Sequence, residues 1–238
     1  MSTIGHKVER IRVSLSSLGP VETVKALMVN ALSYNPAKDR SFDRRFKTVT
    51  SSIVPLDGLG ITDREKTKSA VYYISSPVRF ERYLLGSLNI DYSQFDFVDI
   101  GSGKGRVLMI ASDWPFRSIT GVEISKPLCV VAEKNLQIYS SRTQRCRNIS
   151  VRCMDATQFP IEQKNAVYHF YHPFQPDLLK PMLEKIATTF RGSDTKVYLA
   201  YIWMQLPEIF PLFESLGFKR LQHVETLNRR YQYAIFTI

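Results

Sequence analysis

From about residue 95 onward, the chain alternates short apolar runs with longer segments of helical periodicity. The runs typical of buried strands are Phe95–Ile100, Ser118–Glu123, Ile149–Cys153, Ala166–Tyr171 and Lys196–Trp203. The segments that predict helices are Lys104–Asp113, Pro127–Ser140, Pro176–Phe190 and Pro207–Leu216. Strands that alternate with helices in this way predict a parallel α/β sheet.

The pattern changes at the end of the chain. Gly217 is expected to end the preceding helix, and two extended runs follow at Phe218–Leu227 and Arg230–Ile238. Asn228 and Arg229 join them, and such a two-residue link predicts an antiparallel hairpin. Five crossover strands and this hairpin together predict a sheet of seven strands.

Residues 1–76 lack this alternation. Pro20–Tyr34 carries an apolar stripe at helical spacing, which predicts an amphipathic helix, and Val54–Gly60 is typical of a loop. We expect this segment to be a helical extension that packs near the ligand-binding edge of the sheet and helps to form a substrate pocket. A purely structural buttress is the alternative.

The segment with the clearest chemistry is Asp99–Arg106, which lies between the first strand and its helix. Glycines in such a turn let the backbone approach a ligand, and the helix that follows points its first N–H groups at it. A phosphate-binding P-loop is excluded, because Val98 and Gly105 stand where it needs Gly and Ser or Thr. A dinucleotide turn needs its third glycine at position 106, where this chain has arginine. The remaining pattern is acidic-x-Gly-x-Gly-x-Gly.

Acidic residues follow the next two predicted strands. Glu123 closes the second strand at about the interval from Gly103 at which a ribose-binding acid ends a strand in dinucleotide folds. Asp155 follows the third strand and could accept a hydrogen bond from an adenine amino group, or it could cap a turn. Because the carboxyl ends of parallel strands meet at one edge of a sheet, we expect these groups to face one cleft.

Asp99–Arg106, Gly121–Ser125 and Asp155 resemble the successive cofactor motifs of class I S-adenosylmethionine (SAM)-dependent methyltransferases, over about residues 70–238. The resemblance implies an α/β, Rossmann-like sheet of order 3-2-1-4-5-7-6 with the seventh strand antiparallel. It also implies SAM as cofactor. We therefore expect a SAM-binding domain at 77–238, and the pattern of residues 1–76 leads us to expect a helical extension that serves as a substrate cap.

The cofactor-binding residues that we expect are Tyr73, Asp99, Gly101, Ser102, Gly103, Gly105, Arg106, Glu123, Asp155 and Tyr171. Within this set, Tyr73 is expected to cover the methionine end of the cofactor. Asp99 is expected to fix the glycine turn and to help receive the methionine ammonium group.

More narrowly, the chain resembles a family of bacterial methyltransferases of poorly defined substrate. The resemblance rests on Phe42–Arg45, Val54–Leu56 and the Tyr-x-x-Ser-Pro segment Tyr73–Pro77. After the fourth strand that family tends to have Tyr-Asn-Pro-Phe, as in a loop of amino-group methyltransferases, whereas this chain has His172 in place of Asn. A histidine can accept a hydrogen bond through one ring nitrogen but lacks the geometry of the amide, which weakens the case for an amino acceptor.

His172 and Phe174 are the candidates for the catalytic edge. A sulfonium already activates the methyl group of SAM, so the protein mainly has to hold the acceptor in line. We expect His172 to titrate near working pH and to act as a base, or else only to shape the pocket. Phe174 and Tyr171 could stack on the acceptor or the adenine. His169 lies three residues before His172, and residues at that offset point to opposite faces of a strand. We therefore expect no metal site formed by the two histidines.

Composition adds two limits. The net charge of +10 permits an acidic partner, but the densest basic cluster (Arg142, Arg145, Arg147 and Arg152) is expected at the edge opposite the ligand. Nucleic acid is therefore possible but not favoured. No apolar run reaches the ~18 residues of a membrane span, and the first residues lack an apolar signal core, so we expect a cytoplasmic protein.

The sequence thus predicts methyl transfer from SAM to an unidentified acceptor, an N or O nucleophile of a small molecule or a protein. The rival interpretations are a non-catalytic SAM-sensing or nucleic-acid-binding module, an RNA methyltransferase, and an NAD-type oxidoreductase, which Arg106 opposes. The pattern of residues determines neither the acceptor nor the oligomeric state.

Overall fold

The computed structural model describes residues 24, 36–61, 71–173, 175–202, 206–225 and 232–238. The helix that we predicted at Pro20–Tyr34 lies outside these residues, apart from Val24, and so does Phe174. None of the described helices is long and apolar enough to cross a membrane.

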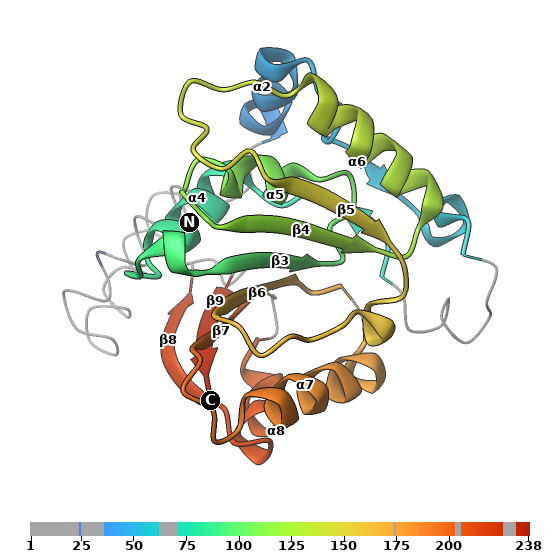
Figure 1. The fold of residues 1–238 in the computed structure, drawn as a ribbon. Helices are drawn as coiled ribbons and strands as arrows, with labels where there is room; N and C mark the ends of the chain where they lie inside the picture. The colour runs from blue at the N-terminus through green and yellow to red at the C-terminus, as the bar shows by residue number, and fades with distance from the viewer. Residues whose placement is uncertain (1–23, 25–35, 62–70, 174, 203–205, 226–231) are drawn as a thin grey trace, which may run out of the picture.

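One twisted seven-stranded sheet forms the centre of the fold, with neighbours in the order β5-β4-β3-β6-β7-β9-β8 (Figure 1). Its strands are β3 (Asp96–Ile100), β4 (Ser118–Glu123), β5 (Ile149–Cys153), β6 (Ala166–Tyr171), β7 (Val197–Ile202), β8 (Lys219–Glu225) and β9 (Gln232–Thr237). The strands β3 to β7 are parallel, and β9 runs antiparallel to both of its neighbours. This is the predicted order 3-2-1-4-5-7-6 with an antiparallel last strand, so the predicted fold class is confirmed.

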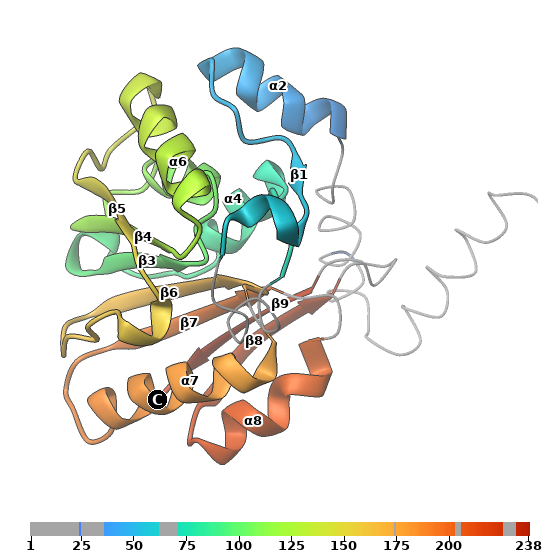
Figure 2. The ribbon, with the colours of Figure 1, turned by 90° about the vertical axis from the view of Figure 1, so that its right-hand side faces the viewer.

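Helices cover both faces of the sheet (Figures 1 and 2). One face carries α4 (Val78–Gly86), α5 (Arg106–Ala111) and α6 (Lys126–Ile138), and the other carries α7 (Pro176–Phe190) and α8 (Phe210–Ser215). Short 3-10 turns occur at η2 (Tyr92–Gln94), η3 (Ala156–Gln158) and η4 (Leu206–Ile209). Neighbouring residues of β3 enter opposite cores, as the period of a strand requires: Phe97 belongs to the same hydrophobic cluster as Leu84 of α4, and Val98 to that of Ile186 of α7.

The described part of residues 36–76 is not simply helical. It contains α2 (Pro36–Phe46), the turn η1 (Leu56–Leu59) and a separate small sheet in which β1 (Ile53–Val54) pairs antiparallel with β2 (Tyr73–Ile74). On α2, Phe42 packs in the same hydrophobic cluster as α4 and α5. The extension thus lies against the sheet domain, while a domain boundary at residue 76 stays a prediction.

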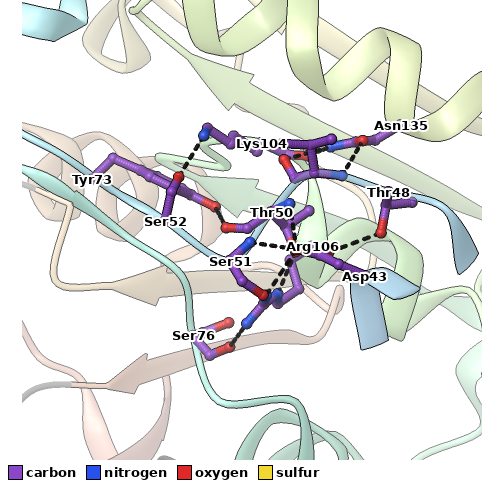
Figure 3. A network of polar contacts seen from close by, with 11 residues as sticks. Asp43, Thr48, Thr50, Ser51, Ser52, Tyr73, Ser76, Lys104, Arg106 and Asn135 are labelled. Carbon is purple, nitrogen blue, oxygen red and sulfur yellow. Dashed lines mark hydrogen bonds and ion pairs between the residues drawn. The ribbon is translucent and has the colours of Figure 1, made fainter. Parts of the chain in front are cut away.

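Arg106 at the start of α5 ties this segment to the sheet (Figure 3). Its Nε donates to Thr50 Oγ1 over 2.7 Å, its Nη1 to the Ser76 carbonyl over 3.0 Å, and its Nη2 to Ser51 Oγ. The side chain is only 2% exposed. A planar guanidinium can reach three acceptors in different directions, which the single ammonium group of a lysine cannot copy.

Asp43 organises the same strap, which we define as residues 43–52, from the other side. Its carboxylate accepts hydrogen bonds from the hydroxyls of Thr48 and Thr50 and from the backbone N–H groups of Thr50 and Ser51. Burial alone would raise the pKa of Asp43, but these hydrogen bonds outweigh it and lower the pKa. On α6, Asn135 accepts from the N–H of Val49 over 2.9 Å, so the strap is held at several points.

We expect Arg106→Lys to lower the free energy of unfolding by about 2 kcal/mol or more, because hydrogen bonds from a charged donor contribute about 1.5–3 kcal/mol each. Urea unfolding measures this change. The matched control is Arg82→Lys, since the Arg82 side chain is 42% exposed in its pair with Asp113 and such pairs contribute about 0–1 kcal/mol. Equal stability of the two variants would contradict the role of Arg106.

Candidate active site

A largely apolar cavity of about 280 Å³ opens where β3, β4, β5 and β6 end. Its apolar wall includes Leu59, Leu128 and Met154. Of the residues that we predicted for the site, those that line it are Tyr73, Asp99, Gly101, Ser102, Arg106, Glu123, Asp155, Tyr171 and His172. The expected gathering of these residues at the carboxyl edge of the sheet is therefore what the structure shows.

The glycine turn folds back against β4. The N–H groups of Gly101 and Ser102 both donate to the carbonyl of Val122, over 2.8 and 3.1 Å. Gly103 has a φ of +53°, and a Cβ there would lie 2.3 Å from Cε2 of Tyr73. Only glycine therefore lets the Tyr73 ring lie against this turn. The Tyr73 hydroxyl donates to the Thr50 carbonyl over 2.8 Å, which anchors the ring to the strap.

Glu123 joins the ends of two strands. Its Oε2 accepts from the N–H of Gly103 and its Oε1 from the N–H of Ser125, each over 2.8 Å. Burial raises the pKa of Glu123, and the two N–H donors act in the opposite direction. Each carboxylate oxygen has two lone pairs, so each can accept one further hydrogen bond from a hydroxyl group in the cavity.

Ser102 lies with its side chain against β4. A Cβ at Gly121 would lie 2.6 Å from Ser102 Oγ and 2.7 Å from Leu108 Cδ1, so only glycine at this position of the strand lets the turn approach. The Ser102 hydroxyl is buried and has no hydrogen-bond partner among the described residues. We did not predict this role for Gly121, and a contact from Ser102 to a cofactor stays a prediction.

Arg106 and Gly105 lie at the back of the turn. Gly105 directly precedes Arg106, which is the first residue of α5, and the guanidinium of Arg106 binds the strap as described above. The structure thus shows a positioning role for Arg106 that we did not expect. Its direct contact with a cofactor, and that of Gly105, stay predictions.

Asp155 caps the turn η3, which is one of the two roles that we considered for it. Its Oδ1 accepts from the N–H of Thr157 over 2.9 Å and from the Thr157 hydroxyl over 2.8 Å. It also lines the cavity beside Met154 and Ala156. A contact with adenine stays a prediction.

The pKa of His172 differs from the one that we predicted. Burial lowers its pKa to about 4, so the pKa near working pH that we predicted is wrong, and the imidazole is neutral at pH 7. Its backbone has a φ of +39°, and its Nδ1 lies 3.3 Å from the hydroxyl of Tyr201 on β7. Tyr201 is fully buried in the core, and no sequence pattern marked it as part of the site.

Behind Asp99 lies a charged contact that we did not predict. Asp99 Oδ1 is 2.7 Å from Nδ1 of His169 on β6, and Nε2 of that ring is 3.1 Å from Oε2 of Glu81 on α4. His169 thus faces α4, whereas His172 contacts Tyr201 in the core of the opposite face. The expected divergence of the two histidines is confirmed.

No protein-family model matches the chain, and no curated protein sequence matches it. Solved structures do resemble it. One is precorrin-6y C5,15-methyltransferase from Geobacter metallireducens GS-15, with a TM-score of 0.51 and 15% identity over 69% of this chain and 88% of that one. Another is ribosomal protein L11 methylase from Lactobacillus delbrueckii subsp. bulgaricus, with a TM-score of 0.50 and 15% identity over 66% of this chain and 76% of that one.

A third similar structure is the mitomycin 7-O-methyltransferase, with a TM-score of 0.50 and 15% identity over 67% of this chain and 55% of that one. Their names specify a precorrin, a ribosomal protein and mitomycin, so this fold serves chemically unlike acceptors. Identity this low shows the fold and not the activity. The chain has the Rossmann-like fold of the class I SAM-dependent methyltransferases.

Proposed function

We propose that this protein transfers the methyl group of SAM to an acceptor, and that the cavity at the carboxyl edge of the sheet binds SAM. The observation that carries the proposal is the position of Glu123. Its carboxylate ends β4 and is held by the N–H of Gly103 in the turn after β3, so that the acid and the turn edge one cavity. A carboxylate in this place can accept hydrogen bonds from both hydroxyl groups of a ribose.

The order of the strands supports the proposal. Asp155 follows β5, Glu123 ends β4 and Asp99 lies near the end of β3, and these three strands are consecutive neighbours in the sheet. SAM is equally linear, with adenine, ribose and methionine in sequence. Adenine near Asp155 and ribose on Glu123 would place the methionine end at β3, beneath Tyr73.

When bound, SAM supplies a methyl group that its sulfonium already activates. The residues of the chain therefore have to bind SAM, orient the acceptor and exclude water. Tyr171 ends β6, the neighbour of β3 on its other side, His172 follows it, and both line the cavity. We assign them to the acceptor. A neutral His172 beside Tyr201 acts as a hydrogen-bonding group that orients the acceptor, because a pKa of about 4 makes it a weak base. Phe174 remains a candidate for stacking.

The basic cluster does not support a nucleic-acid acceptor. Arg142, Arg145 and Arg147 are exposed in the loop between α6 and β5, at the amino end of the strands, whereas the cavity opens at their carboxyl ends. A substrate bound by these arginines would be held away from the proposed methyl group. The mainly apolar cavity instead favours an acceptor that is at least partly enclosed.

We expect the protein to bind S-adenosylhomocysteine in preference to NAD, and Glu123→Gln to weaken that binding about tenfold or more. The reason is that a charged hydrogen bond contributes about 1.5–3 kcal/mol, and about 1.4 kcal/mol corresponds to tenfold in affinity. Isothermal titration calorimetry measures the affinities.

The matched control for Glu123→Gln is Glu162→Gln, because the Glu162 side chain is 62% exposed in an ion pair with Lys164. Circular dichroism shows whether both variants keep the fold. Unchanged affinity in Glu123→Gln would remove the ribose assignment, and tight binding of NAD alone would end the proposal of a methyltransferase.

His172→Asn is expected to make the protein relatively more stable towards acid. The pKa of His172 is about 4 in the folded chain, against an ordinary 6.5. Between these values the unfolded chain binds a proton that the folded chain refuses, so stability falls as the pH falls from about 6.5 to about 4. Urea unfolding at pH 7 and pH 5 should therefore show a smaller loss in the variant than in wild type. An equal loss would mean that His172 titrates normally.

A further inference from the structure

Three ionisable side chains meet beneath the cavity, in the layer between the sheet and α4. His169 and Glu81 are fully buried, and Asp99 is 2% exposed. Asp99 and His169 are direct partners in the parallel pairing of β3 with β6, so their side chains leave the same face of the sheet side by side. Glu81 reaches them from the first turns of α4. Of the three, only Asp99 lines the cavity.

Geometry favours a protonated ring in this group. Both ring nitrogens of His169 lie within hydrogen-bond distance of a carboxylate oxygen, at 2.7 and 3.1 Å. A neutral imidazole has one donor and one acceptor nitrogen, whereas the protonated ring donates from both. When both carboxylates are ionised, only the protonated ring can donate to each of them, and the group then carries a single net negative charge. Burial alone would lower the pKa of His169, but Glu81 and Asp99 outweigh it and raise the pKa to about 10.

Stability alone does not explain this arrangement. Burying charged groups costs free energy that their attraction often fails to recover, and apolar side chains of similar volume commonly serve as well. Here one oxygen of Glu81, Oε1, is buried without a hydrogen-bond partner among the described residues. A purely structural network would be expected to satisfy such an atom.

Glu81 changes what Asp99 presents to the cavity. With His169 as its only neighbour, the charge of Asp99 would be cancelled by the imidazolium. The carboxylate of Glu81, on the far side of the ring, offsets that positive charge. The network as a whole therefore presents one negative charge beneath the end of β3, where the methionine end of the cofactor would lie.

We propose that Glu81 and His169 are positioning residues that hold Asp99 in place and keep its charge uncompensated, so that the floor of the cavity recognises the ammonium group of the cofactor. This inference rests on the proposed function. It adds to that function two residues that do not line the cavity, one of them from α4, and a reason for the buried charges.

The test compares two ligands that share adenine, ribose and sulfur. S-Adenosylhomocysteine carries the ammonium group, and 5′-methylthioadenosine lacks the whole amino-acid end. We expect Glu81→Gln to weaken binding of S-adenosylhomocysteine about tenfold or more in calorimetry, as loss of a unit charge at close range would do at an effective dielectric constant of about 20. Binding of 5′-methylthioadenosine should change less than about twofold, since its groups do not meet this charge.

A double variant tests the compensation of charge directly. The double variant Glu81→Gln/His169→Asn removes one negative and one positive charge and leaves Asp99 as the single negative group. Its preference for S-adenosylhomocysteine over 5′-methylthioadenosine should return to near the wild-type ratio. Glu133→Gln, an exposed change on α6, is the control and should leave both affinities unchanged.

Equal weakening of both ligands in Glu81→Gln would make the network purely structural and overturn the inference, as would no weakening of either. Failure of the wild-type protein to bind either ligand would instead reject the proposed function itself. Should Glu81→Gln not fold, nitrogen-15 NMR of wild type decides: protons on both nitrogens of His169 at pH 8 support the inference, and a singly protonated ring overturns it.

Discussion

The hydrogen bond from the Gly103 N–H to Glu123 is the interaction on which the rest of the site depends. It spans the gap between the turn after β3 and the end of β4, and holds both at the rim of one cavity. Two close approaches make it possible, because Gly121 leaves room for Ser102 and Gly103 leaves room for Tyr73. The strap then closes over this turn, held by Arg106 and Asp43. A side chain at either glycine would separate the parts that define the site.

Much of the sheet could be predicted from local pattern, since its strands are buried, apolar and separated by helices of clear period. The predicted limits of β4, β5 and β6 agree with the structure to the residue. The β1–β2 pair could not be predicted, because each strand has two residues and the partners lie far apart in the chain. The helix α4 was missed as well, although Pro77 stands directly before its first residue, a common place for a helix to begin.

The residues of the site likewise divide into those that the sequence predicts and those that it does not. Glu123 and the glycine turn follow from spacing along the chain, because the edge of a parallel sheet brings successive strand ends together. The partners of Arg106, the contact of Tyr201 with His172 and the pair Glu81 with His169 all join distant segments, and no spacing reveals them. The low pKa of His172 has the same origin, since it comes from burial, which no residue type displays by itself.

The fit of Tyr73 against Gly103 has a consequence for how such a chain can change over generations. A methyl group at position 103 would overlap the aromatic ring, and the φ of +53° would strain any side chain there even without the ring. Loss of the ring would uncover Gly103 on that side and would remove the hydroxyl that binds the strap. Position 103 is therefore constrained by two independent causes, and related chains should keep glycine there even where the residue at position 73 differs.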